Sequence, residues 1–197
     1  LQIIKQLNQL EEESIEVGTI DNIIHRLEDE QSSQKFWSIS EKGVVKIIHI
    51  SFKHFLEEHG FYKFNPEGSK NYVFVRVTNN LIDHTSEKEI KDFILNHLIE
   101  LDEIQAYNHF AECTRYFREE FLTLLSSIDV YFIEDTKGSA YLYYNNSAVK
   151  ITYNNITSID YLDLGGYVWK DHVIDRPYIK CESTDCDYKS FIENICN

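Results

Sequence analysis

The sequence predicts an α+β fold, because the spacing of its hydrophobic residues changes along the chain. Before Ser127, apolar residues recur mostly every three or four positions, as in helices that bury one face, and strand-like runs interrupt them from Phe36 onward. After Ser127 the period becomes two, which is typical of antiparallel strands. The 197 residues are 43% hydrophobic and 14% aromatic, enough for one fair-sized domain or two small ones.

The order of these patterns predicts N-terminal helices, a small winged-helix-like α/β element, a helical middle and a C-terminal antiparallel β-meander. The first helices fall in residues 1–34, where Thr19 is a suitable N-cap and the polar run 28–34 marks a boundary. We therefore predict three parts. They are an N-terminal helical segment at 1–34, a winged-helix-like and helical part at 35–127, and a meander at 128–197 that leads into a truncated helix.

Strand and helix signals alternate in the first half of the second part. They predict strands at 36–40, 44–50, 61–64 and 71–80, and a helix at 51–60. Ser51 is the expected N-cap of that helix, and Gly60 is its expected stop. A strand, a helix and a β-wing in this order are typical of a winged-helix element, and a small α+β layer has the same pattern.

The helical middle begins at a capping box, in which Ser86 and Glu89 cap each other's backbone at the start of a helix over 86–100. A stripe of apolar residues follows at intervals of three or four positions, and it predicts a helix or a helix pair with one buried face. The stripe consists of Ile104, Tyr107, Phe110, Cys113, Phe117, Phe121, Leu124 and Ile128.

The meander is expected from four apolar-rich runs, at 129–133, 140–144, 148–152 and 161–170. The polar stretch Asn145-Asn146-Ser147 separates the second run from the third. Because Asn tolerates positive φ, this stretch predicts a tight hairpin turn.

The chain carries a formal net charge of −14, which argues against nucleic-acid binding because phosphate contacts need Lys and Arg. The charge is uneven, however, since residues 35–76 hold seven basic residues against four acidic ones. Aromatic residues interleave with these bases, and the combination suits phosphate contact and base stacking. The candidate nucleic-acid-binding residues are Lys42, Lys46, Lys53, Lys63, Lys70 and Arg76. The alternative is that they solvate the outer face of a small domain.

We expect no catalytic residue and no metal ligand in this chain. The sequence contains no P-loop, no dinucleotide-binding fingerprint after a strand and no nucleophile elbow. Its four cysteines, at 113, 181, 186 and 196, lack the two close pairs that zinc sites usually have, which favours free thiols.

Two acidic clusters are weaker candidates for a metal site. Asp135 and Lys137, with Asp129 upstream, fit half of a metal-dependent nuclease site, but the stretch is more typical of a turn between strands. Asp171 and Asp175 flank His172, but neighbouring residues on a strand point to opposite faces, so this set does not converge on one point.

Two long stretches resemble a known family. Residues 141–178 read YLYYNNSAVKITYNNITSIDYLDLGGYVWKDHVIDRPY and precede the acidic run DCDYKSFIENI, while residues 61–94 read FYKFNPEGSKNYVFVRVTNNLIDHTSEKEIKDFI. Over about residues 36–197 the chain is similar to the region just upstream of the helicase core in phage, plasmid and mobile-element primase–helicases. Their N-terminal accessory domain resembles that of the poxvirus-type primase–helicase. The family's strand–Asn-Gly–strand hairpin is matched by Asn146-Ser147, with Ser in place of Gly.

The resemblance implies a non-catalytic accessory domain that acts in DNA replication ahead of a superfamily-3 helicase core, expected beyond Asn197. It implies DNA, the chain's own helicase domain and other subunits of a ring as partners, in the cytoplasm of a bacterial host cell. It implies no cofactor for this part of the protein, because ATP and Mg²⁺ belong to the helicase core, and a primase site would precede Leu1. The chain lacks Met and any run near the ~18 apolar residues of a membrane span, so we expect a soluble fragment of a longer protein without a membrane partner.

Three hypotheses about function follow. The first is the accessory domain, contacting DNA through the basic residues at 35–76. The second is an acidic protein-interaction domain without nucleic-acid contact, and the third is a metal-dependent nuclease at Asp135 and Lys137. Clustering of the six basic residues on one exposed face favours the first hypothesis. Dispersal of these residues, or pairing with Glu57, Glu58 or Glu67, favours the second.

Overall fold

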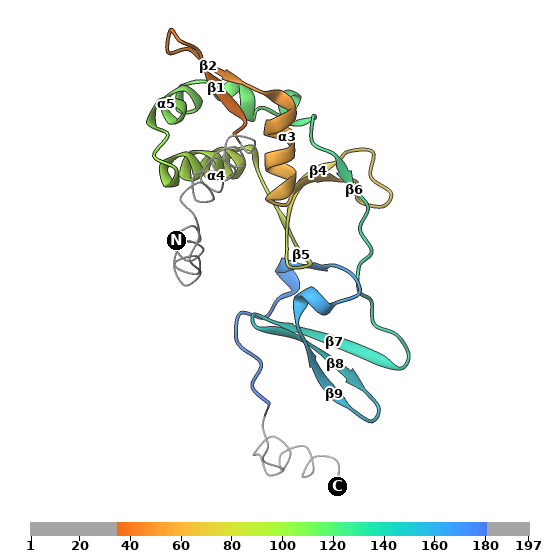
Figure 1. The fold of residues 1–197 in the computed structure, drawn as a ribbon. Helices are drawn as coiled ribbons and strands as arrows, with labels where there is room; N and C mark the ends of the chain where they lie inside the picture. The colour runs from red at the N-terminus through yellow and green to blue at the C-terminus, as the bar shows by residue number, and fades with distance from the viewer. Residues whose placement is uncertain (1–34, 181–197) are drawn as a thin grey trace, which may run out of the picture. The chain divides into compact units, whose positions relative to one another are not determined.

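A computed structural model describes residues 35–180 of the chain (Figure 1). It confirms the α+β class, because it contains both helices and strands and ends in an antiparallel set of strands. The helices predicted within 1–34 and at the C-terminal end lie outside the described residues.

The described chain divides into two compact units. Unit 1 comprises residues 35–63 and 85–126, and unit 2 comprises residues 64–84 and 127–180. The predicted division at 127/128 lies close to the last of the three boundaries between the units, at 126/127. Residues 64–84 group with the C-terminal part, however, and not with the rest of the predicted 35–127 part, because their strands pair within unit 2.

Unit 1 begins with the predicted strand pair and helix. Strands β1 (Trp37–Ile39) and β2 (Val45–Ile47) pair antiparallel, and Gly43 provides the positive φ of +74° in the turn between them. Helix α3 (His49–Glu58) follows, and then strand β3 (Phe61–Phe64) begins after Gly60, whose φ of +85° confirms the predicted helix stop.

The predicted N-cap of α3 is wrong. The helix begins at His49 with Ile48 as its N-cap residue, so Ser51 lies inside the first turn. The chain passes from β2 directly into the helix, and the backbone N–H of Phe52 already donates to the carbonyl of Ile48 at 2.9 Å. This early start buries Phe52 in the core.

Helix α4 (Glu87–Glu100) confirms the predicted capping box. The hydroxyl of Ser86 accepts from the backbone N–H of Glu89 at 3.2 Å, and the Glu89 carboxylate accepts from the backbone N–H of Ser86 at 2.7 Å.

The apolar stripe after α4, expected to form a helix or a helix pair, forms three short helical elements. Helix α5 (Ile104–Glu112), the 3₁₀ helix η1 (Thr114–Phe117) and helix α6 (Glu119–Leu122) follow one another. Extended backbone at Arg118, with a ψ of 151°, separates η1 from α6 and shifts which positions face inward. Leu122 and Leu125, which lie off the stripe, are buried, while Ile104, the first residue of α5, is 55% exposed.

Unit 2 contains a hairpin that the sequence analysis did not predict. Strand β4 (Val73–Thr78) pairs antiparallel with β5 (Leu81–His84), and β10 (Val168–Trp169) pairs parallel with β5. The turn between β4 and β5 is Asn79-Asn80, where both residues have left-handed φ values of +51° and +61°.

The meander is confirmed at the predicted runs 140–144 and 148–152, but its remaining strand lies between the runs 148–152 and 161–170. Strands β7 (Ser139–Tyr144), β8 (Ser147–Thr152) and β9 (Ile156–Ile159) form an antiparallel sheet. The run 129–133 contributes an isolated bridge from Phe132 to Tyr167 and no strand, and only the short strand β6 (Ser127–Ile128) precedes it. The run 161–170 forms the 3₁₀ helix η2 (Tyr161–Asp163) and β10, and the 3₁₀ helix η3 (Lys170–His172) begins at its last residue.

The Asn145-Asn146 turn forms as predicted but for a different reason. Within residues 35–180 the non-glycine residues with positive φ are Asn79, Asn80 and Asp102, so left-handed backbone does not explain this turn. The Asn146 side chain instead donates to the Tyr178 carbonyl at 3.1 Å and accepts from the Tyr178 backbone N–H at 2.7 Å. Asn146 thus holds the chain that follows η3 against the hairpin.

Each unit buries its own apolar cluster. In unit 1 the ring of Phe36 is fully buried and lies between rings of β1, α3 and α5. In unit 2, Tyr161, Leu164 and Val168 pack with Ala148 of β8. The Asn80 side chain closes this second cluster by donating to the carbonyls of Tyr161 at 2.9 Å and Leu164 at 3.2 Å.

Replacing Asn80 with Gly separates its two roles, because Gly keeps the positive φ but removes both hydrogen bonds. We expect Asn80→Gly to lower the local stability of unit 2 by about 1–2 kcal/mol, the usual cost of leaving buried carbonyls without donors. Hydrogen–deuterium exchange of residues 161–168 would then be faster. Asn79→Gly is the matched control and should leave this exchange unchanged. Equal exchange in both variants would show that the turn backbone alone matters.

Candidate functional site

The six predicted nucleic-acid-binding residues are divided between the two units. Lys42, Lys46, Lys53 and Lys63 belong to unit 1, whereas Lys70 and Arg76 belong to unit 2.

Three of these six basic residues lie beside acidic or carbonyl groups of the same unit. The Lys53 ammonium lies 3.6 Å from the Glu57 carboxylate, and the Lys63 ammonium donates to the Thr123 carbonyl at 2.7 Å. Arg76 lies on β4 directly opposite Asp83 of β5. The Lys53–Glu57 ion pair is the kind of pairing that we expected for a protein-interaction domain.

Lys42 and Lys46 remain exposed on the β1–β2 hairpin. Neither forms an ion pair or hydrogen bond with another described residue. The amide of Gln105 in α5 donates to the Gly43 carbonyl at 2.7 Å, which fastens the turn of the hairpin to unit 1. The hairpin therefore presents two solvated ammonium groups on a supported turn.

A shallow groove of about 530 Å³ lies in the same unit, between the start of α3 and the η1–α6 segment. His49, Arg115, Arg118 and Phe121 line it together with Tyr116 and Glu120. The Arg115 guanidinium lies 4.7 Å over the Tyr116 ring, and the His49 ring meets Phe121 edge to face at 5.2 Å.

The groove is positively charged. Its lining carries two guanidinium groups against the single carboxylate of Glu120. The Arg115 guanidinium donates a hydrogen bond of 2.6 Å to the Tyr116 hydroxyl, which raises the pKa of Arg115. Guanidinium groups beside aromatic rings suit phosphate or carboxylate ligands, because their planar donors match both anions.

Sequence reasoning missed Arg115 and Arg118, because both lie in the stretch expected to form a buried-face helix. The break of that helix at η1 and α6 exposes them and brings them near His49, more than sixty positions earlier in the chain. No sequence motif signals this juxtaposition.

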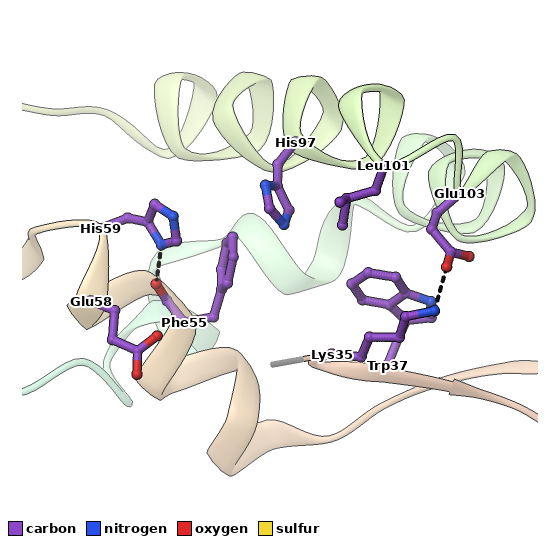
Figure 2. Close-up of a pocket in the computed structure, with 8 residues that line it drawn as sticks. All are labelled: Lys35, Trp37, Phe55, Glu58, His59, His97, Leu101 and Glu103. Atoms are coloured by element: carbon purple, nitrogen blue, oxygen red, sulfur yellow. Dashed lines mark hydrogen bonds and ion pairs between the residues drawn. The ribbon is translucent and has the colours of Figure 1, made fainter. Parts of the chain in front are cut away.

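A deeper pocket of about 320 Å³ lies in unit 1 between α4 on one side and α3 and β1 on the other (Figure 2). Phe55 and Trp37 contribute aromatic walls, and His97 of α4 points toward the Phe55 ring (Figure 2). At one end the Lys35 ammonium forms an ion pair with the Glu103 carboxylate at 2.5 Å. Glu58 and His59, at the end of α3, line the opposite end of the pocket. Leu101 lines the pocket on the α4 side.

The two imidazoles of this pocket differ in environment. His59 Nδ1 lies 2.7 Å from the Phe55 carbonyl, which only accepts, so Nδ1 carries a proton and donates to it. Burial and the neighbouring His59 lower the pKa of His97, against the opposing effect of Glu100. The histidines seemed scattered in sequence, and only the packing of α3 against α4 brings these two together.

The weaker candidates of the sequence are placed as follows. The Asp135 carboxylate accepts from the backbone N–H of Tyr141 at 2.9 Å, so it orders the loop before β7. Asp171 and His172 lie in η3 and are exposed. Cys113 is a free, half-buried thiol, and the other three cysteines lie outside the described residues. Within residues 35–180, no three His, Cys, Asp or Glu side chains gather in a metal-binding arrangement.

Among the described helices, none has the length and apolar character needed to cross a membrane. Comparisons with protein-family models, with curated proteins and with solved structures find no match to this chain.

The lowered pKa of His97 predicts a pH dependence of stability. An unfolded histidine takes up a proton near its ordinary pKa of 6.5, whereas folded His97 does so only at lower pH. The unfolded state therefore binds more protons as the pH falls through 6.5, so this contribution to stability is complete above that pH and is lost below it. Urea unfolding of His97→Gln should show a smaller loss of stability between pH 7.5 and 5.5 than the unaltered protein. His54→Gln, at an exposed position of α3, is the control, and the same loss in all three proteins would contradict the prediction.

Proposed function

We propose that this chain is a non-catalytic accessory module of a primase–helicase that acts in DNA replication, and that unit 1 contacts the phosphate backbone of DNA. The observation that carries the proposal is the basic, aromatic-lined groove at Arg115 and Arg118, in the same unit as the exposed lysines of the β1–β2 hairpin. Phosphate contact needs such solvated cations, and aromatic neighbours suit the bases of a single strand.

The distribution of charge supports this role. The whole chain has a net charge of −14, but residues 35–180 hold 21 acidic against 16 basic residues, a net charge of −5. Most of the negative charge thus belongs to the two terminal segments. The objection from overall acidity is correspondingly weaker for the part of the chain that holds the groove.

The resemblance to the region upstream of primase–helicase cores supports the same proposal, since an accessory module needs a binding surface and no catalytic constellation. The second candidate is an acidic protein-interaction module without DNA contact. The Lys53–Glu57 ion pair and the Lys63–Thr123 hydrogen bond favour this candidate, because they remove two of the six predicted cations from DNA contact.

Fluorescence anisotropy with labelled single- and double-stranded DNA across a salt series distinguishes the two candidates. We expect salt-sensitive binding by the unaltered chain. The double variant Lys42→Glu/Lys46→Glu should bind more weakly, with a log–log salt slope less steep by about two, since each phosphate contact contributes about one. Arg118→Gln should weaken binding in the same direction.

The matched control is Lys70→Glu/Lys137→Glu, which reverses two exposed lysines of unit 2. It should change binding less than the hairpin variant does. Absence of binding by the unaltered chain at low salt would reject DNA contact and favour the protein-interaction candidate. An equal effect of both double variants would reject the placement of the contact on unit 1.

A further inference from the structure

The pocket between α3 and α4 already holds one ammonium group, that of Lys35. This group is paired with the Glu103 carboxylate at 2.5 Å and lies 5.7 Å from the centre of the Trp37 ring (Figure 2). A carboxylate and an indole face are the two groups that recognise organic cations in proteins. The Lys35 side chain is 44% exposed, so it sits at the mouth of the pocket and does not fill it.

The surroundings of the pocket favour a second positive charge. Glu58 lies at the other end and forms no ion pair with another described residue. The C-terminal end of α4, with Glu100 as its last residue, meets the pocket through His97 and Leu101. The C-terminal end of a helix carries a partial negative charge and attracts cations.

At neutral pH, His97 adds no positive charge that would repel a cationic ligand. Burial lowers the pKa of His97, so its imidazole is uncharged there. His59 Nδ1 is engaged within the fold, because it donates to the Phe55 carbonyl at 2.7 Å.

We propose that this pocket binds a guanidinium or alkylammonium group of a basic ligand, held by the Glu103–Trp37 pair in place of Lys35, while the carboxylate of Glu58 at the opposite end adds to the attraction for cations. An arginine side chain fits this arrangement best, because a planar guanidinium stacks on an aromatic face while its fork of donors reaches carboxylates. Lys35 then acts as an internal competitor that the ligand displaces. The pocket volume of about 320 Å³ accommodates one such side chain.

Nuclear magnetic resonance titration of the whole chain tests the proposal. The probe is N-acetyl-arginine amide, and the control is N-acetyl-citrulline amide, which has the same shape without the charge. We expect the arginine compound to shift the Trp37 indole and the His97 signals and the citrulline compound to leave them in place. Equal shifts with both compounds, or no shift with either, would overturn the proposal.

Substitutions test the individual groups. Glu58→Gln and Glu103→Gln should each weaken binding about two- to fivefold, the range for a partly exposed ion pair. Lys35→Met should strengthen binding about two- to fivefold, because it removes the competing ammonium from the Trp37 face. Glu67→Gln, at an exposed position of unit 2, is the control and should have no effect. Unchanged or weaker binding in Lys35→Met would contradict the competition.

Two sources could supply the cation, and a further pair of probes separates them. A peptide with arginines spaced by glycine and serine represents a basic segment of a protein, and spermidine represents a free polyamine. Tighter binding of the peptide at equal ionic strength assigns the site to a protein partner, and tighter binding of spermidine assigns it to a small amine. Failure of both to bind would overturn the proposal. DNA binding by the groove is measured separately, so this result does not depend on it.

Discussion

The packing of aromatic rings around Phe36 is the interaction on which both the groove and the pocket of unit 1 depend. The Phe36 ring is fully buried, with its centroid 4.7 Å from that of Phe55, 5.3 Å from Phe52 and 5.5 Å from Phe110. These contacts join β1, α3 and α5 in one core. From it, Phe55 extends to the wall of the pocket, and Phe52 reaches the Phe121 ring of the groove at 5.9 Å. A change in this core would therefore move both surfaces together.

The two surfaces of unit 1 have opposite charge. The groove offers two guanidinium groups for an anion, whereas the pocket offers carboxylates and an indole face for a cation. The proposed DNA contact and the proposed cation site thus use different parts of unit 1. In unit 2, hydrogen bonds from asparagine side chains hold distant segments together. The side chains of Asn80 and Asn146 bond to backbone groups that are distant in sequence.

Local patterns predicted most elements, and contacts between distant residues account for the errors. The capping box at Ser86, the helix stop at Gly60 and the Asn145-Asn146 hairpin are short-range signals, and the structure confirms them. The start of α3, the break between η1 and α6, and the position of strand β9 are decided by packing, which sequence spacing does not report. The binding surfaces follow the same rule. Arg115 and His97 carry no local motif, and only the fold places them beside His49 and His59.

The most direct test of the central claim, that the fold of unit 1 builds a surface for DNA, is a hydrogen–deuterium exchange footprint. Exchange of the whole chain would be compared with and without a short DNA at low salt. Slower exchange at residues 42–50 and 113–121, which hold the hairpin lysines and the groove, is the result that our account predicts. Protection confined to unit 2, or no protection while the DNA is demonstrably bound, would contradict it.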